Sequence, residues 1–201
     1  MAFSIFAAGD PALSPRFDDL ELAVSQVRTA EIFDPATVQA QAEVLAFCAD
    51  HRDALHRNCL TGHLTGSALV ISATADQTLL LHHTKLDRWL QPGGHADGDG
   101  NLAGVALKEA TEETGIEGLR VVTPAVDIDI HVIPERGDVP EHLHHDVRFV
   151  VLAPPGARVD HNEEALDFRW VGGDDPVLSE SSELLRSVTR ALAVAVTLDR
   201  R

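Results

Sequence analysis

The chain has 201 residues, of which 44% are hydrophobic and 24% are charged, so its length suits one domain with a substantial core. Thirty-two acidic residues against sixteen basic ones give a formal net charge of −16, which argues against binding of long nucleic acid through a basic surface. A small anionic substrate remains compatible with this charge, because a bound cation can bridge acidic side chains and an anionic ligand.

Cysteine content and hydropathy bear on the compartment. Cys48 and Cys59 are the only cysteines, which is too few for a disulfide framework, and their spacing is not that of a metal-binding pair. The first ten residues lack the basic start and the apolar run of a signal peptide. No apolar stretch is long enough to span a membrane. We therefore expect a cytoplasmic protein that has no membrane partner.

The first sixty residues favour helices. Residues 18–29 are compatible with a short amphipathic helix, and Asp34 followed by Pro35 is a typical helix start. The run 35–49 has apolar residues at helical spacing, and a second short helix is expected at 51–57. We expect this segment to cover one face of a sheet; a dimer contact is the alternative. The apolar side expected for the run 35–49 consists of Val38, Ala42, Leu45, Ala46 and Ala49.

Strands are expected from Gly66 onward. Between 121 and 133, apolar residues alternate with Asp127, Asp129 and His131, so these three polar side chains should share one face of a strand. Mixed strands with interspersed helices predict an α+β or α/β sandwich. Further strands are expected at 67–72, 78–82, 147–153 and 168–171, and a closing helix at 180–197 with an apolar stripe of Leu184, Leu185, Val188, Leu192 and Val196.

The most informative stretch is 93–116, where a glycine-rich turn leads into a helix expected at 101–114. Glu109, Glu112 and Glu113 share one face of that helix because they are three or four residues apart. Carboxylates this close repel one another unless a cation lies among them, and oxygen ligands favour Mg²⁺ or Mn²⁺. A solvated acidic helix face is the alternative interpretation.

Three neighbouring features favour the metal site over that alternative. Paired glycines precede the helix, Lys108 lies beside the carboxylates, and Gly115 suits the left-handed position just past a helix end.

This stretch resembles the signature of the Nudix hydrolases, G-x5-E-x7-R-E-U-x-E-E-x-G-U, in which U is aliphatic. Gly94 opens the motif, and KEATEETGI at 108–116 closes it without a gap. Two positions differ, because Gly100 replaces a glutamate and Lys108 replaces an arginine. Asp97 or Asp99 could supply the missing carboxylate. A longer similarity to a subset of the family covers HHTKLDRWLQPGGHADGD at 82–99.

The resemblance implies a Nudix-like α/β/α sandwich with a mixed β-sheet. Residues 1–64 would form an N-terminal helical extension packed on the core, and 65–201 the Nudix hydrolase domain. The implied activity is pyrophosphohydrolysis, dependent on Mg²⁺ or Mn²⁺, of a small nucleoside diphosphate linked to another group. A non-catalytic Nudix-fold module that binds a nucleotide or regulates a partner is the alternative, and the three retained glutamates favour the enzyme. A homodimer is left open.

The resemblance also implies roles for residues. Glu112 and Glu113 would be the main metal ligands, and Glu109 a further ligand or the base that orients water. The Gly93 carbonyl would complete the coordination, and Lys108 would orient a carboxylate or touch a phosphate. The base could instead lie outside the motif; Glu163 and Glu164, expected in a loop, are candidates, and simple solvation of both is the alternative.

The chain also contains eleven histidines, a high number for this length. In EHLHHD at 141–146, His142, His144 and Asp146 would share one face of an extended segment, and the face of Asp127, Asp129 and His131 could lie opposite. A polar wall of the substrate pocket, a transition-metal site and a hydrated strand end are the three interpretations. His95 follows the glycine pair and should line the site. The candidate substrate-binding residues are thus His95, Asp129, His131, His144, Asp146 and Glu164.

Overall fold

The structure is a computed structural model that describes residues 2–32, 34–84 and 86–199. Lys85, part of the similarity at 82–99, lies outside the described residues. The helices are α1 (Leu20–Arg28), α2 (Pro35–Asp50), α3 (Leu102–Thr114) and α4 (Ser182–Asp199), with 3-10 turns at Pro11–Leu13 and Pro176–Glu180. The strands are β1 (Ser4–Ala7), β2 (Gly62–Ile71), β3 (Thr78–His83), β4 (Arg88–Leu90), β5 (Gly93–His95), β6 (Arg120–Thr123), β7 (Asp127–Ile133), β8 (His142–Leu152) and β9 (Ala165–Val171).

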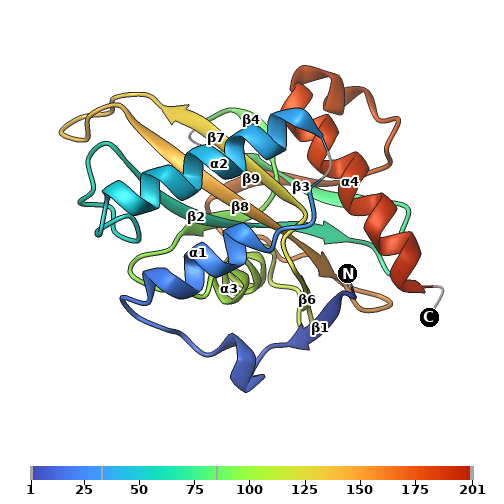
Figure 1. Ribbon diagram of the computed structural model, residues 1–201. Helices are drawn as coiled ribbons and strands as arrows, with labels where there is room; N and C mark the ends of the chain where they lie inside the picture. The colour runs from blue at the N-terminus through green and yellow to red at the C-terminus, as the bar shows by residue number, and fades with distance from the viewer. Residues whose placement is uncertain (1, 33, 85, 200–201) are drawn as a thin grey trace.

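These strands form one mixed, nine-stranded sheet (Figure 1). Its long central pair is β2 and β8, which run parallel, so that His63 lies beside His144 and Thr65 beside Asp146. The path β1-β6-β8-β2-β3-β4 is extended by β5 on β2, by β7 on β8 and by β9 on β3.

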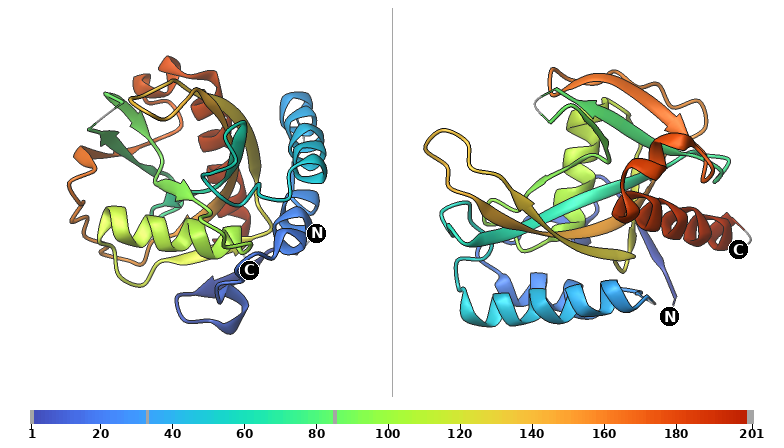
Figure 2. Two further views of the ribbon diagram at one scale, coloured as in Figure 1. Left: turned by 90° about the vertical axis from the view of Figure 1, so that its left-hand side faces the viewer. Right: turned by 90° about the horizontal axis from the view of Figure 1, so that it is seen from above.

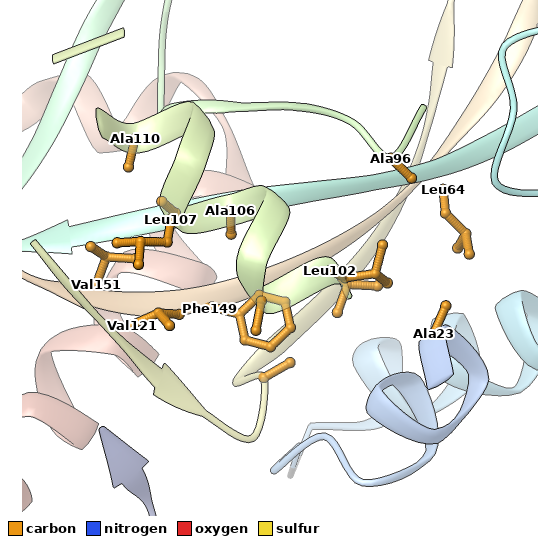
Figure 3. Close-up of a cluster of buried hydrophobic side chains, with 14 of the residues drawn as sticks. Ala23, Leu64, Ala96, Leu102, Ala106, Leu107, Ala110, Val121, Phe149 and Val151 are labelled. Carbon is orange, nitrogen blue, oxygen red and sulfur yellow. The ribbon is translucent and has the colours of Figure 1, made fainter. Parts of the chain in front are cut away.

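Helices cover both faces of the sheet, which confirms the predicted α/β/α sandwich. Side chains of α1, α2 and α3 pack with alternate residues of β2, including Leu64 and Ala68, whereas α4 packs against the other set, including Leu69 and Ile71. Figure 2 shows α2 and α4 on different sides of the strands. The larger core is built around the fully buried Phe149, beside the α3 residues Leu102 and Ala106 (Figure 3).

Most predicted elements are present, and two are wrong. Residues 51–57 form turns rather than a second helix. The run 121–133 is divided, because β6 ends at Thr123 and a cis peptide bond joins Thr123 to Pro124 before β7 begins. Proline cannot donate a ladder hydrogen bond, which is consistent with a break there.

The predicted apolar stripe of α2 is out of register, and that of α4 is correct only in part. In α2 the buried residues are Thr37, Val44 and Cys48, whereas Val38 is 49% exposed. The Thr37 hydroxyl reaches Asp127 of β7 at 3.2 Å, which turns this side of the helix toward the sheet. In α4 the predicted Leu184 and Val188 are buried, whereas the predicted Leu185 and Val196 are exposed. The other buried residues of α4 are Ser187, Ala191, Val194 and Ala195.

The N-terminal segment is attached to the sheet and to α3. β1 pairs antiparallel with β6, and α1 packs beside α2 (Figure 1). The Gln26 amide donates to Asn101 at 3.0 Å, which connects α1 to the residue that caps α3. None of the described helices is long and apolar enough to cross a membrane.

Candidate active site

The carboxylate helix α3 is fixed at both ends. Asn101 caps its start by accepting a hydrogen bond from the Gly104 backbone N–H at 3.4 Å. Gly115 ends it in the left-handed conformation, with φ of 63°, as the sequence predicts. The helix therefore holds its acidic face in a defined position against the turn at Gly93 and Gly94.

Two of the three glutamates contact that turn directly. Glu113 Oε1 accepts a hydrogen bond from the Gly93 backbone N–H at 3.1 Å. Glu109 packs against Gly94 so closely that a Cβ at position 94 would lie 2.5 Å from the Glu109 Cδ. A side chain at position 94 would displace this carboxylate, which explains the glycine there.

Lys108 holds the third glutamate beside the first. Its Nζ lies 3.2 Å from Glu109 Oε1 and 3.6 Å from Glu112 Oε2. Glu112 is 57% exposed and Glu109 only 18%, so Lys108 connects a solvated carboxylate to a partly buried one. Lysine thus orients two carboxylates at the position where the family pattern has arginine.

Burial and mutual repulsion disfavour the charged form of two carboxylates on the acidic face. Burial is the main cause that raises the pKa of Glu109, with Glu112 and Glu164 adding to it and Lys108 opposing it. Burial likewise raises the pKa of Glu113 to about 8, opposed by the Gly93 N–H and reinforced by Glu109 and Glu164. A cation at this face would favour the charged form of each carboxylate.

Glu164 reaches this field from a loop that is attached to the end of α3. The Asn162 backbone N–H donates to the Glu113 carbonyl oxygen at 3.2 Å, and its side-chain oxygen accepts from the Glu164 backbone N–H at 2.9 Å. Asp160 donates through its N–H to the Thr114 carbonyl oxygen at 2.8 Å. Of the two loop candidates for the base, Glu164 is therefore placed to act on Glu109 and Glu113.

A family model described as NUDIX domain matches residues 63–192, nearly two thirds of the chain. The chain belongs to the NUDIX domain family. A hydrolase of this family from Clostridium perfringens is similar in fold, with 20% identity and a TM-score of 0.47 over 66% of this chain and 97% of the other. The E. coli dihydroneopterin triphosphate pyrophosphohydrolase has 12% sequence identity and a TM-score of 0.48, over 67% of this chain and 95% of the other. The C. elegans Ap4A hydrolase has 16% sequence identity and a TM-score of 0.44, over 69% of this chain and 98% of the other. Among curated proteins, no relative matches the chain.

The structure explains why this NUDIX domain lacks the first glutamate of the motif. Gly100 lies beneath the N-terminal segment, and its N–H donates to the Arg16 carbonyl oxygen at 2.9 Å. A Cβ at position 100 would collide with the carbonyl oxygen of Asp19. The backbone at Arg16 and Asp19 therefore occupies the space that a side chain at position 100 would need.

The two aspartates suggested as replacements have other partners. Asp97 accepts two hydrogen bonds from Arg57, at 2.6 and 2.7 Å. Asp99 accepts from the backbone N–H groups of Arg16 and Asn101, at 2.8 and 2.9 Å. Both carboxylates thus fix the loop before α3, and neither is free to replace the missing glutamate in this conformation.

Arg57 is the residue near this site that sequence reasoning missed. The hydrogen bond to Asp97 is the main cause that raises the pKa of Arg57; burial opposes it, and the charges of Asp97, Glu109 and Glu164 add to it. Arg57 belongs to the turns that replace the expected helix, outside the family motif, so no local pattern indicated it. It supplies a permanent positive charge beside the acidic face.

The predicted polar face of β7 and β8 is present. Asp129 lies beside Asp146 and His131 beside His144, as alternation on the two strands predicts. His145 points to the other face, where its ring stacks on Phe47 of α2 at 4.0 Å.

Along this polar face the aspartates are paired with arginine. Arg148 donates to Asp127, Asp129 and Asp146 at 3.0, 2.9 and 2.8 Å. Asp129 also accepts from Arg186 of α4 at 3.4 Å. A role of Asp129 and Asp146 in substrate binding stays a prediction, since the contacts that the structure provides hold the sheet together.

Proposed function

We propose that this protein is a divalent-metal-dependent pyrophosphohydrolase that cleaves a nucleoside diphosphate linked to another group. Membership of the NUDIX domain family supports a hydrolase. The observation that carries the proposal is the contact of Glu109 and Glu113 with the glycine turn, at a face where Glu112 and Glu164 add further negative charge.

The donor set fits Mg²⁺ or Mn²⁺. Glu109, Glu112 and Glu113 offer only oxygen atoms, the Gly93 carbonyl would add another, and hard cations prefer such ligands. Burial and the neighbouring carboxylates raise the pKa values of Glu109 and Glu113, and a bound cation would act against both causes. When bound, the ion would neutralise phosphate oxygens and lower the pKa of water.

The chain's own groups would position the substrate and the nucleophile. The Gly93 N–H orients Glu113, and Lys108 holds Glu109 and Glu112 together, where it would also contact a phosphate oxygen of the substrate. Glu109 or Glu164 would accept the proton of the attacking water, because both lie in the same electrostatic field. His95, directly after the turn, lines the cavity beside His63 and His144, and it would contact a part of the substrate that extends into that cavity.

The wider expectations form part of the same proposal. The substrate would be a small nucleotide-type diphosphate met in the cytoplasm, and residues 1–64 would act as an extension that supports the domain at 65–201. The packing of Arg16 and Asp19 over Gly100 favours such a supporting role. The proposal leaves a homodimer open, and light scattering on the active protein would measure whether it self-associates.

The test compares Glu113→Gln with Glu117→Gln. Glu117 is exposed and lies just beyond α3, so it controls for the loss of one acidic charge. Both proteins would be assayed with Mg²⁺ and with Mn²⁺ on ADP-ribose, sugar nucleotides, dinucleoside polyphosphates and nucleoside triphosphates, with products identified. We expect the Glu113 variant to lose at least about 100-fold in turnover and to keep its melting temperature, because a first metal ligand should matter more than an outer one. The Glu117 variant should match the parent.

Two outcomes would contradict the proposal. Equal turnover of the parent and Glu113→Gln would remove the assigned role. Tight binding of a nucleotide without hydrolysis under any metal would instead support the non-catalytic module.

A further inference from the structure

A cluster of histidines lies beside the glycine turn, on the face of the sheet away from α3. β2 places His63 opposite His144 of β8, and Thr65 opposite both Asp146 and His95 of β5. His63, His95 and His144 thus come from three strands that are distant in sequence. Their ring centroids are separated by 4.9 Å (His63–His95), 4.9 Å (His63–His144) and 4.8 Å (His95–His144).

The nitrogen atoms of these rings converge. One ring nitrogen from each of His63, His95 and His144 lies within 4.8 Å of the other two, and among the residues that the structure describes no other trio of histidine, cysteine or acidic side chains is gathered so tightly. The carboxylates of α3 are therefore more open than this cluster in the same structure.

Several of these nitrogen atoms have no partner within the described part of the chain. There, both ring nitrogens of His63 and the Nε2 of His144 are buried without a hydrogen bond that meets normal geometry, and His63 as a whole is 3% exposed. Buried polar atoms normally have a partner, so buried ring nitrogens this close together indicate a ligand that accepts nitrogen lone pairs, as a metal ion does.

The donors are all imidazoles, and each imidazole ring binds a metal ion through one ring nitrogen.

This cluster is separate from the carboxylate face. Successive residues of a strand point to opposite faces, so His95 and Gly94 of β5 face opposite ways. Glu109 packs on the Gly94 side, whereas Gly93 meets Ser67, which shares its face of β2 with Thr65 and His63. One short strand therefore separates a set of nitrogen donors from a set of oxygen donors.

A cavity of about 340 Å³ opens next to the cluster. All three histidines line it, together with His142, Arg57 and Arg136. An ion held by the three rings would have an open side toward this cavity, where water or an anionic group could complete its coordination.

We propose that His63, His95 and His144 form a site for a zinc-type divalent transition-metal ion, distinct from the oxygen-ligand site on α3. Three imidazoles with one open position make a tetrahedral set that suits Zn²⁺ or Co²⁺, whereas Mg²⁺ and Mn²⁺ prefer oxygen ligands. With metal–nitrogen bonds of about 2.0–2.1 Å, tetrahedral ligands are about 3.3 Å apart. Rotations of the rings would have to bring the nitrogens closer than their present limit of 4.8 Å.

The first experiment uses the unmodified full chain, without a histidine tag. Isothermal titration with Zn²⁺ in excess Mg²⁺ should show one equivalent bound per chain, and X-ray absorption of that complex should show three imidazole nitrogens in the first shell. Absence of binding, or a shell of oxygen atoms only, would overturn the proposal.

Variants then locate the ion. The double substitution His63→Asn with His144→Asn should weaken Zn²⁺ binding at least about 100-fold, because it removes two of three ligands, whereas His56→Asn, at an exposed histidine bonded to Asp18, should bind as the parent does. Unchanged affinity in the double variant would refute the site. If that variant does not fold, the first-shell measurement on the parent decides.

A second comparison separates this proposal from the hydrolase proposal. Glu109→Gln with Glu113→Gln should abolish Mg²⁺-dependent turnover and leave Zn²⁺ affinity unchanged. A large loss of Zn²⁺ affinity in that variant would place the ion among the carboxylates and refute the histidine site. A protein with no hydrolase activity that still binds Zn²⁺ through histidine would contradict only the proposed function.

Discussion

Replacing Arg148 by methionine should destabilise the protein more than any exposed arginine replacement. The Arg148 side chain is 6% exposed and donates to three carboxylates, those of Asp127, Asp129 and Asp146, at 2.8 to 3.0 Å. Asp127 and Asp129 retain contacts with Arg186, but within the described residues Asp146 would keep only the side-chain hydrogen bonds from the hydroxyl groups of Thr65 and Ser67. Methionine fills similar space without charge, so the substitution leaves a buried carboxylate without its cation.

The expected magnitude follows from breaking a buried ion pair on one side. Such a loss costs about 3–5 kcal/mol of unfolding free energy. For a chain of this size, about 2–4 °C of melting temperature corresponds to each kcal/mol, so the melting temperature should fall by about 6–20 °C. The assay is urea unfolding at pH 7.5, followed by circular dichroism and by intrinsic fluorescence to test for a two-state transition.

Arg169→Met is the matched control. Arg169 is 48% exposed and pairs with Asp175 at 3.0 Å, so its loss should cost no more than about 1 kcal/mol. The same chemical change is thus made at a solvated ion pair and at a buried one.

The pH dependence gives a second check with a definite sign. Burial alone would raise the pKa of Asp129, yet its bond with His131 and the charges of Arg148 and Arg186 hold that pKa well below the usual range. In the parent this contribution to stability is present above about pH 4 and is lost only as the pH falls toward the folded pKa.

In Arg148→Met, burial should raise the pKa of the aspartate left without its cation. The folded variant then binds protons more readily than the unfolded chain, so its stability should rise as the pH falls from 7.5 to 5. The difference in unfolding free energy between the variant and the parent should therefore become smaller between pH 7.5 and pH 5. Two results would refute this account of the network. One is a loss of unfolding free energy no larger than that of Arg169→Met, and the other is a loss that does not change with pH.

Three further predictions concern packing and the site. Gly100→Ala should lower unfolding free energy by about 1–3 kcal/mol, measured by urea unfolding, because its methyl group would collide with the Asp19 carbonyl oxygen; unchanged stability would show that the N-terminal segment moves aside freely. Phe149→Ala should cost about 3–5 kcal/mol in the same assay, since the ring is fully buried in the larger core. Asn162→Ala should lower kcat about tenfold, about 1.4 kcal/mol of barrier, with little change in melting temperature, because the Asn162 side chain donates to the Glu112 carbonyl oxygen and accepts from the Glu164 backbone N–H; an unchanged kcat would show that this side chain does not position Glu164 for the reaction.

Local patterns predicted the elements on which the site is built. The capped helix α3, its left-handed Gly115 and the alternation of Asp127, Asp129 and His131 depend on contacts between residues close in sequence, which spacing reveals. The short helix expected at 51–57 failed for the opposite reason. That segment is fixed by distant contacts, such as the pairing of Arg57 with Asp97, and residue type alone does not encode them.

The same distinction applies to the two candidate metal sites. The oxygen donors of α3 are visible in sequence because they share one helix, whereas His63, His95 and His144 meet only through the register of three strands. The spacing of His142, His144 and Asp146 indicated one face of β8, but nothing in the sequence identified His63 as the neighbour of His144 in the sheet. A strand slip by one residue would send that ring to the other face.

The missing motif glutamate and the N-terminal segment are best understood together. Gly100 accommodates the backbone at Arg16 and Asp19, and the same segment contributes Arg57, a positive charge in the field of Glu109. The loss of one acidic side chain is thus accompanied by the approach of a chain segment that fixes the loop before α3. Removal of the Arg57 charge by Arg57→Met should therefore lower the affinity for an anionic diphosphate, which would be measured as a raised KM. Arg52→Met, in the same turn region, is the control and should leave KM unchanged. Equal KM values for the two variants would contradict a role of Arg57 in substrate binding.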